Sequence, residues 1–257
     1  DDLIFYLAEA ERLDEEHYSA TRVFGAIGAR RTFSDTFFAE AALGASSILA
    51  EDVFGKRRFK YAAGRIRAEY DQRNSRVNPS SGYYLQGAAS PFIGFDGSKS
   101  GLHLKGDGRV YYGLGADDRI VLAGRLQIGS VFGPSLSEIS PTLLFFSGGA
   151  GTVRGHEYQS LGVPVGSGTA GGRSFAALSG EVRGKVTDKI SLVGFYDLGF
   201  VDADSFVSGS SARHAGAGVG LRYDVAGIGP LRLDLAYPVD GGSEDGLQFY
   251  IGIGQAF

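Results

Sequence analysis

The sequence has 257 residues and a formal net charge of −4, so it gives no sign of nucleic-acid binding. It contains no cysteine, which excludes a disulfide framework and any thiolate metal site. Although 43% of the residues are hydrophobic, they form no run of roughly eighteen, which excludes a transmembrane helix.

Apolar and polar residues alternate along most of the chain, and this period predicts strands rather than helices. The pattern is clearest in the C-terminal half, where Val219, Leu221 and Tyr223 share one face and Arg222 takes the other. We count twelve strands, which in chain order cover residues 2–10, 17–30, 35–50, 57–71, 82–92, 101–114, 119–132, 173–187, 189–202, 213–225, 230–238 and 246–257.

Alternation alone would also fit a soluble β-sandwich. The polar face favours a barrel, because several strands place arginine beside a carboxylate there, as Arg65, Arg67 and Glu69 do. Inside a lumen such charges meet each other and water, while the apolar face meets lipid. We therefore predict an all-β fold, a transmembrane antiparallel β-barrel that forms one domain over residues 1–257.

The longest connection, residues 133–172, interrupts this series of strands and has no predicted element of its own. Its centre reads Gly151-Thr152-Val153-Arg154-Gly155 within a glycine-rich stretch. Loops of this length in compact domains are usually functional, and the glycines leave Arg154 as the strong, fork-shaped donor at the tip. The simpler alternative is a flexible surface loop with a solvated arginine.

Two acidic residues on neighbouring predicted strands are expected to face inward near the base of this loop. The alternation in 173–187 and 189–202 directs Glu181 and Asp197 to the same face. A carboxylate in a partly dry lumen needs a partner, and Arg154 can bind one bidentately. Alternatively, Glu181 pairs locally with Arg183 or with a cross-strand lysine.

The loop resembles the Val-Arg-Gly-Tyr/Phe loop of the bacterial outer-membrane assembly and translocation superfamily, the relatives of BamA and TamA. The stretch Tyr158-Gln159-Ser160-Leu161-Gly162 and the later Gly171-Gly172-Arg173-Ser174 resemble the TamA branch most. His156 departs from the pattern, because the branch usually has an aromatic residue there.

This resemblance implies that the loop folds into the lumen and is anchored there by Val153, Arg154 and Gly155. It also implies that Arg154 bridges Glu181 and Asp197, which occupy two further motif positions. Barrels of the superfamily have sixteen strands and follow periplasmic POTRA domains. We therefore expect this chain to be the C-terminal part of such a barrel, although a natural twelve-stranded barrel is an alternative.

The function that the resemblance implies is the insertion or secretion of client outer-membrane proteins, such as autotransporters, in the outer membrane of a Gram-negative bacterium. Client proteins, outer-membrane lipid and a TamB-like partner that spans from the inner membrane are the implied partners. The alternatives are a passive channel, a two-partner secretion transporter, a barrel attached to a patatin-like lipase, and the branch of the main assembly machine.

The last predicted strand, residues 246–257, ends on an aromatic residue, as outer-membrane barrels typically do. The resemblance implies that Phe257 belongs to an assembly signal, and that this strand, with Tyr250, Gly252 and Gly254, forms a lateral seam. Glycine weakens strand pairing, so we expect this strand to be the least firmly paired. Alternatively, the two glycines relieve crowding inside the lumen.

Signals for enzymes are weak. Residues 166–171 match a dinucleotide fingerprint only in spelling, because no βαβ unit surrounds them. The four histidines are scattered without metal-ligand spacing, and no nucleophile elbow occurs. We expect no catalytic, cofactor-binding or metal-binding residues.

Overall fold

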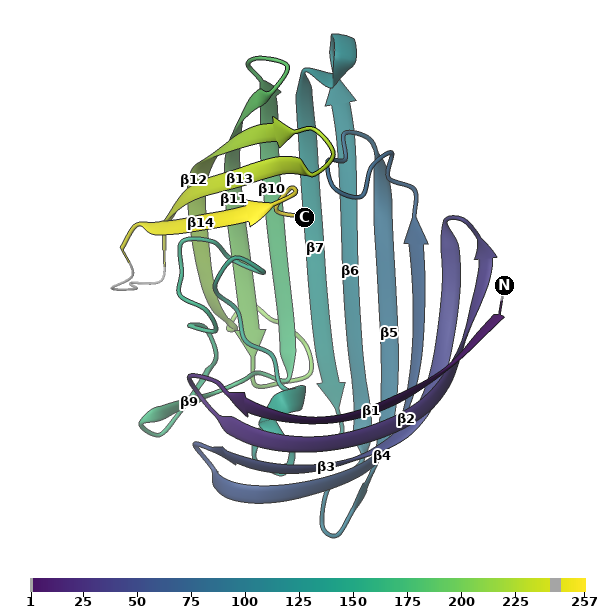
Figure 1. The fold of residues 1–257 in the computed structure, drawn as a ribbon. Coiled ribbons are helices and arrows are strands. Elements are labelled where there is room, and N and C mark those ends of the chain that lie inside the picture. Colours follow the sequence, from purple (N-terminus) through teal and green to yellow (C-terminus); the bar gives the residue numbers. More distant parts are fainter. Residues whose placement is uncertain (1, 241–245) are drawn as a thin grey trace.

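The computed structural model describes residues 2–240 and 246–257 and consists almost entirely of one curved antiparallel sheet (Figure 1). Its twelve strands follow the order of the sequence, and each pairs with the next. They are β1 (Asp2–Asp14), β2 (Ser19–Ser34), β3 (Phe37–Asp52), β4 (Gly55–Asp71), β5 (Gly82–Phe95), β6 (Gly101–Leu114), β7 (Ile120–Phe132), β10 (Ser174–Lys185), β11 (Ile190–Asp202), β12 (Ala212–Val225), β13 (Gly229–Pro238) and β14 (Gln248–Ile253).

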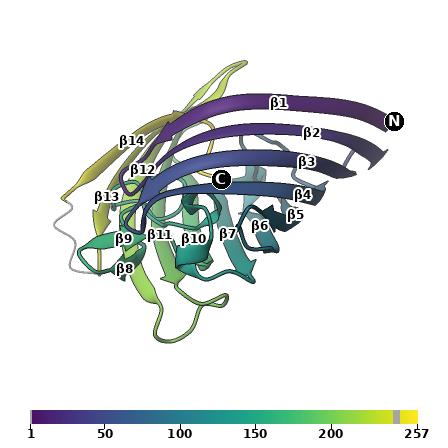
Figure 2. The same ribbon diagram turned by 90° about the horizontal axis from the view of Figure 1, so that it is seen from below.

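The sheet curls into an incomplete barrel whose first and last strands are its two edges. Seen from below, β1 to β4 arch over one side of the molecule, and the C-terminal strands β12 to β14 lie at its left (Figure 2). Among the described residues no ladder joins β1 to β14. In the described part of the chain, no helix has the length and apolar composition that crossing a membrane requires.

The alternation seen in the sequence separates an apolar outer face from a polar inner face. Leu43, Ile66 and Val219 point outward and are each more than 60% exposed. Their strand neighbours point inward, and many of them are charged. The predicted fold class is thus confirmed, and all twelve predicted strands are present.

Three predicted strand limits were wrong by four residues. The second strand continues to Ser34 rather than residue 30. The first strand continues to Asp14 rather than residue 10, because β1 pairs with β2 in unbroken register as far as Ser19. The last strand ends at Ile253 rather than residue 257, because Gly254 adopts a φ of +87° and turns the chain out of the sheet.

The long connection 133–172 is ordered locally, which the sequence analysis did not predict. It contains two short 3-10 helices, η2 (Leu136–Glu138) and η3 (Pro141–Leu143), and a small hairpin of β8 (Val163–Val165) and β9 (Gly168–Ala170). Isolated bridges from Phe145 to Gly172 and from Ser147 to Leu161 hold its two halves together.

This loop also supplies part of the interior packing. Ile139 and Phe145 are buried in a cluster with inward side chains of the wall, among them Tyr61, Phe92 and Val131. Burying such side chains is favourable by roughly 1.5–3 kcal/mol each. Part of the loop is therefore held inside the barrel and does not lie free over its mouth.

Candidate functional site

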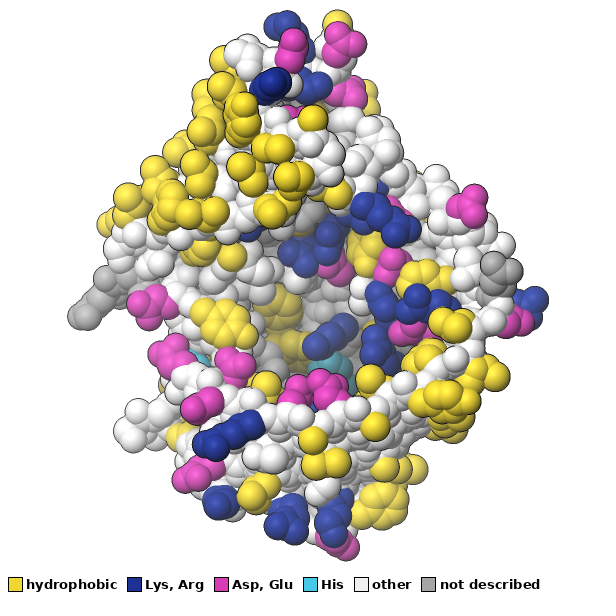
Figure 3. Space-filling model, in the orientation of Figure 1, with side chains coloured by type: hydrophobic (Ala, Val, Ile, Leu, Met, Phe, Trp, Pro, Cys, Tyr) yellow, Lys and Arg dark blue, Asp and Glu magenta, His cyan; other side chains and the backbone are white. Residues whose placement is uncertain are grey.

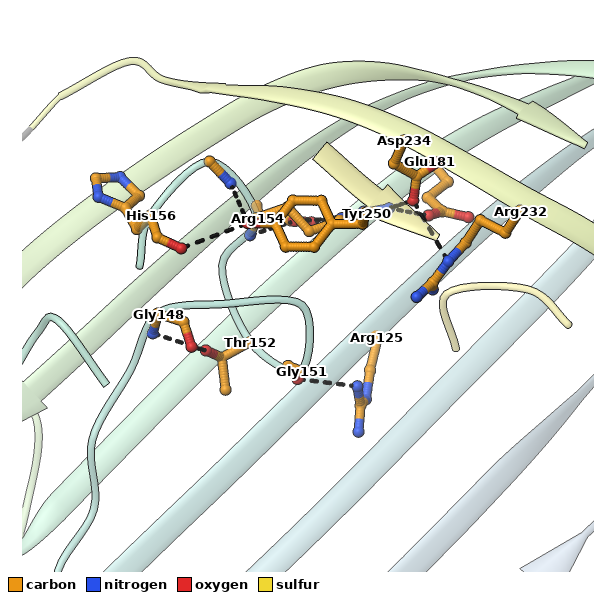
Figure 4. A network of polar contacts seen from close by, with 12 residues as sticks. Arg125, Gly148, Gly151, Thr152, Arg154, His156, Glu181, Arg232, Asp234 and Tyr250 are labelled. Atoms are coloured by element: carbon orange, nitrogen blue, oxygen red, sulfur yellow. Dashed lines mark hydrogen bonds and ion pairs between the residues drawn. The ribbon is translucent and has the colours of Figure 1, made fainter. Parts of the chain in front are cut away.

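Arg154 lies inside the barrel and binds two carboxylates of the wall (Figure 4). Its Nε and Nη2 atoms donate to Asp197 Oδ2 and Oδ1 over 2.7 and 3.0 Å, and its backbone N–H donates to Oδ2 over 3.1 Å. Its Nη1 atom donates to Glu181 Oε1 over 2.7 Å. The geometry at Asp197 is the bidentate fork that makes arginine–carboxylate pairs strong.

The two carboxylates come from β10 and β11, and the strand register explains their closeness. Glu181 is opposite Phe195, and Asp197 is opposite Ser179, so the two acids lie diagonally on the inner face. The guanidinium of Arg154 lies 3.5 Å from the centroid of the Phe195 ring between them. Both acids were predicted partners of Arg154, and both contacts are present.

The local alternative for Glu181 is present as well. Arg183, two residues along β10, donates from Nε to Glu181 Oε2 over 2.8 Å. Glu181 therefore has one arginine on each carboxylate oxygen, whereas Asp197 accepts side-chain hydrogen bonds from Arg154. The two acids differ in how much they depend on the loop.

A third carboxylate, which the sequence analysis did not assign to the loop, completes the cluster. Asp234 on β13 accepts from Arg154 Nη1 over 3.3 Å and from Arg222 Nη1 over 2.5 Å. Its inward direction follows from the alternation of 230–238. The same alternation directs Arg232 inward, and its Nε atom lies 3.7 Å from Asp234. That Asp234 also reaches the loop could not be read from its own strand, because Arg154 is remote in sequence.

The cluster is almost completely removed from solvent. Arg154, Glu181 and Asp197 are 2%, 3% and 1% exposed. Burial alone would lower the pKa of Arg154, but hydrogen bonding to Asp197 and the charges of Asp197 and Glu181 raise that pKa above its ordinary value. Arg154 therefore stays cationic, and the free energy of the cluster depends on complete pairing.

Two glycines allow the loop to approach the wall this closely. Gly155 has a φ of +94°, and a Cβ placed on it would lie 2.8 Å from the carbonyl carbon of Tyr237 on β13. A Cβ on Gly216 of β12 would collide with the carbonyl oxygen of Arg154. Val153, the third predicted anchor, is fully buried beside them.

His156 keeps a ring contact although it replaces the expected aromatic residue. Its ring centroid lies 4.2 Å from that of His214 on β12, at an interplanar angle of 37°. Its Nε2 atom donates to the carbonyl oxygen of Ala215 over 2.8 Å, and His214 Nε2 lies 2.8 Å from Ser147 Oγ. An imidazole thus packs against the wall as an aromatic ring would and adds a hydrogen bond.

Tyr250, predicted as part of the seam, points inward from β14 and contacts the loop (Figure 4). The backbone N–H of Gly155 donates to its hydroxyl oxygen over 3.0 Å, and the hydroxyl lies 3.4 Å from the carbonyl oxygen of His156. The loop is therefore bonded to each of the last five strands of the sheet, β10 to β14. Among residues 2–240 and 246–257, no group of three or more side chains is arranged to hold a metal ion.

The comparison with protein families decides the relationship. Residues 18–257 match the Omp85 superfamily domain. The chain belongs to the Omp85 superfamily.

Solved structures with the same fold are much longer than this Omp85 chain. BamA from Haemophilus ducreyi lacking POTRA domains 1–3 is similar, with a TM-score of 0.80 and 15% identity over 96% of this chain and 57% of that one. CdiB from Acinetobacter baumannii is similar with a TM-score of 0.61 and 15% identity, over 90% of this chain and 41% of that one. The chain thus spans about half the length of the structures it resembles.

The C-terminal residues of this Omp85 chain leave the sheet before the predicted end of the last strand. Gly252 lies in β14 beside Arg232, but after Gly254 the chain turns inward, and Phe257 is buried against Tyr111. Arg183 lies 5.6 Å from the centroid of the Phe257 ring. The prediction that the strand extends to Phe257 was wrong, because the backbone N–H of Gly254 makes the last bond to β13, at Pro230, and the backbone N–H of Gln255 donates instead to Val77 in the turn after β4.

Proposed function

We propose that this chain is the barrel of an outer-membrane factor that inserts or secretes client β-barrel proteins such as autotransporters. The observation that carries the proposal is the buried Arg154 cluster, which holds the long loop inside a barrel of the Omp85 superfamily. A loop seated this firmly occupies the space that a passive pore would leave open. We further propose that the chain belongs to the TamA branch and has a TamB-like protein as its partner. The stretch from Tyr158 to Gly162, which resembles that branch, supports this assignment.

The mechanism needs no hydrolysis and no cofactor, and we propose that the chain is not an enzyme. β14 has only six residues, whereas about nine to eleven are needed to cross a bilayer at the usual tilt. Separating a strand pair with so short a ladder costs less free energy than separating the longer pairs of the sheet. The exposed edge then offers unpaired backbone groups that a client strand can bind by β-augmentation.

A disulfide across this edge tests the mechanism. One cysteine replaces Ile251, and a second is placed on the strand that closes the barrel against β14. Because the chain has no cysteine of its own, these two form a defined pair. The control variant carries the Ile251→Cys change alone. We expect the oxidised double variant to remain folded but to stop assembling an autotransporter client in proteoliposomes, and reduction to restore assembly.

Full client assembly with the crosslink formed would contradict lateral opening. Single-channel conductance in planar bilayers separates the main alternative, because a passive channel conducts steadily while the seated loop of an assembly factor blocks the lumen. A large, stable conductance of the unmodified protein would favour the channel.

A further inference from the structure

The inner wall opposite the Arg154 cluster carries an excess of positive charge. Between β2 and β7 a belt of inward side chains crosses the middle of the wall, and Figure 3 shows dark blue cations gathered in the hollow there. The belt comprises six cations and three carboxylates: Arg30, Arg65, Arg67, Lys105, Arg109 and Arg125, with Glu40, Glu69 and Asp107. The whole chain, by contrast, has a net charge of −4.

The carboxylates of the belt are shared rather than paired one to one. Arg30 lies 2.8 Å from Glu40, and Arg65 and Arg67 approach the other oxygen of Glu40 at 3.5 and 3.6 Å. Arg67 also pairs with Glu69 at 2.5 Å, so three arginines face two carboxylates here and one positive charge is left on the lumen side.

Asp107 is shared in the same way. Arg109 and Arg125, from β6 and β7, lie 2.8 and 2.7 Å from its carboxylate. Lys105 extends the excess, because within the described part of the chain its ammonium has no carboxylate within ion-pair distance and instead lies 5.7 Å from the centroid of the Phe145 ring.

A cavity of about 410 Å³ lies at this belt and gives the charges a place to act. Three cations, Arg22, Arg65 and Lys105, and one carboxylate, Glu40, line it together with aromatic and aliphatic side chains such as Phe92. Its volume is within the range of small-ligand sites, and its walls combine apolar surface with more cations than acids.

We propose that this belt binds an acidic, aromatic-bearing segment of polypeptide in extended conformation. The spacing of the cations favours a chain over a single headgroup. Neighbouring strands are about 4.8 Å apart, so the belt from β2 to β7 covers roughly 24 Å. An extended chain presents side chains on one face about every 6.8 Å and meets several cations in succession, whereas one phosphate meets only one point of the belt.

The inference rests on the proposed function and deepens it, because it adds to the lateral edge a second contact for the client, in the part of the lumen that the loop leaves free, and names the chemistry of the segment bound there. The test uses peptide binding alone, so its failure is distinguishable from a failure of client assembly. The probes are two fluorescent peptides of equal length, one alternating glutamate with tyrosine and the other alternating lysine with tyrosine. The full chain is reconstituted in zwitterionic lipid nanodiscs, and binding is followed by fluorescence anisotropy.

We expect the acidic peptide to bind, the basic peptide to fail, and affinity to fall as salt rises, since exposed charges are screened. Replacing Arg65 and Lys105 with glutamine should weaken binding by about fivefold or more. The charge-matched control replaces Lys56 and Lys189, which are exposed at strand ends, with glutamine. This control should bind the acidic peptide as tightly as the parent protein does.

Equal binding of both peptides, or of the belt and control variants, would overturn the proposal. So would displacement of the acidic peptide by a short-chain phosphatidylglycerol with higher affinity, which would assign the belt to a lipid headgroup. Heat-dependent migration on gels shows whether the belt variant is folded. If the belt variant is unfolded, two measurements on the parent protein still test the proposal: the salt dependence of acidic-peptide binding, and the comparison of the acidic with the basic peptide.

Discussion

Replacing Arg154 with alanine is the most direct perturbation of the cluster. The change removes three side-chain hydrogen bonds to Asp197 and Glu181 and a weaker contact to Asp234. Glu181 keeps Arg183, and Asp234 keeps Arg222, but among the described residues the carboxylate of Asp197 is left with only the backbone N–H of residue 154. The cost of the substitution is therefore concentrated at Asp197.

Breaking a buried ion pair by removing one partner costs about 3–5 kcal/mol. The surviving partners of Glu181 and Asp234 favour the lower end of that range. About 3 kcal/mol shifts the equilibrium between a seated and a displaced loop by roughly a hundredfold. Asp197→Asn in the same background removes the stranded charge and should recover part of that loss.

The measurement is proteolysis of the loop from outside intact cells. We expect the Arg154→Ala protein to be cleaved within residues 133–172 while the parent resists. Arg125→Ala is the matched control, because Arg125 also contacts the loop, at the carbonyl oxygen of Gly151, but its partner Asp107 retains Arg109. Equal resistance of the Arg154 variant and the parent would refute the reasoning that the cluster seats the loop.

Three further predictions follow from single contacts. Gly216→Val should displace the loop as Arg154→Ala does, because its side chain would occupy the position of a loop carbonyl; unchanged protease resistance would contradict the close approach. Tyr250→Phe keeps the ring but removes the acceptor of the Gly155 N–H, so hydrogen exchange should rise in β14 more than in β2. Glu138 has a pKa lowered chiefly by a backbone hydrogen bond at the start of η2. The ionised carboxylate therefore stabilises η2 fully above pH about 4.5, and this stabilisation is lost as pH falls through the lower folded-state pKa. Hydrogen exchange within η2 should rise only in acid, and Glu138→Gln should remove this pH dependence.

The strands and the first half of the site were predictable for the same physical reason. Lipid on one side and a polar lumen on the other force a period of two on every strand, and that period also fixed the inward direction of Glu181 and Asp197. Arg154 could be assigned to them because two inward carboxylates required a cation. The internal order of the loop was not predictable, since it comes from side chains such as Ile139 that pack against distant strands rather than from a local period.

The C-terminal residues were mispredicted because their partners are remote in sequence. Nothing local to residues 254–257 reveals that Val77, in the turn after β4, accepts the backbone N–H of Gln255. The alternation of 246–257 is broken only by Gln255, in the phase of Ile251 and Ile253, and one polar residue near the end of a strand does not by itself predict a turn. A positive φ at Gly254 is permitted by glycine but not demanded by it, so the sequence allows both a straight strand and a turn.

The contacts of these last residues connect them to the loop through the same buried charges. Arg154 binds Asp234, Asp234 binds Arg222, and Arg222 Nε donates to the side-chain oxygen of Gln255 over 3.0 Å. Tyr250 adds a second connection from the loop to the last strand. Each buried charge in this series is costly without its partner. If the loop is displaced, Asp234 loses Arg154, and the contacts of Arg222 with Asp234 and Gln255 are weakened. If the last strand is displaced, the loop loses its hydrogen bond to Tyr250. Loop and terminal strand therefore behave as one energetic unit, although more than ninety residues separate Gly155 from Tyr250.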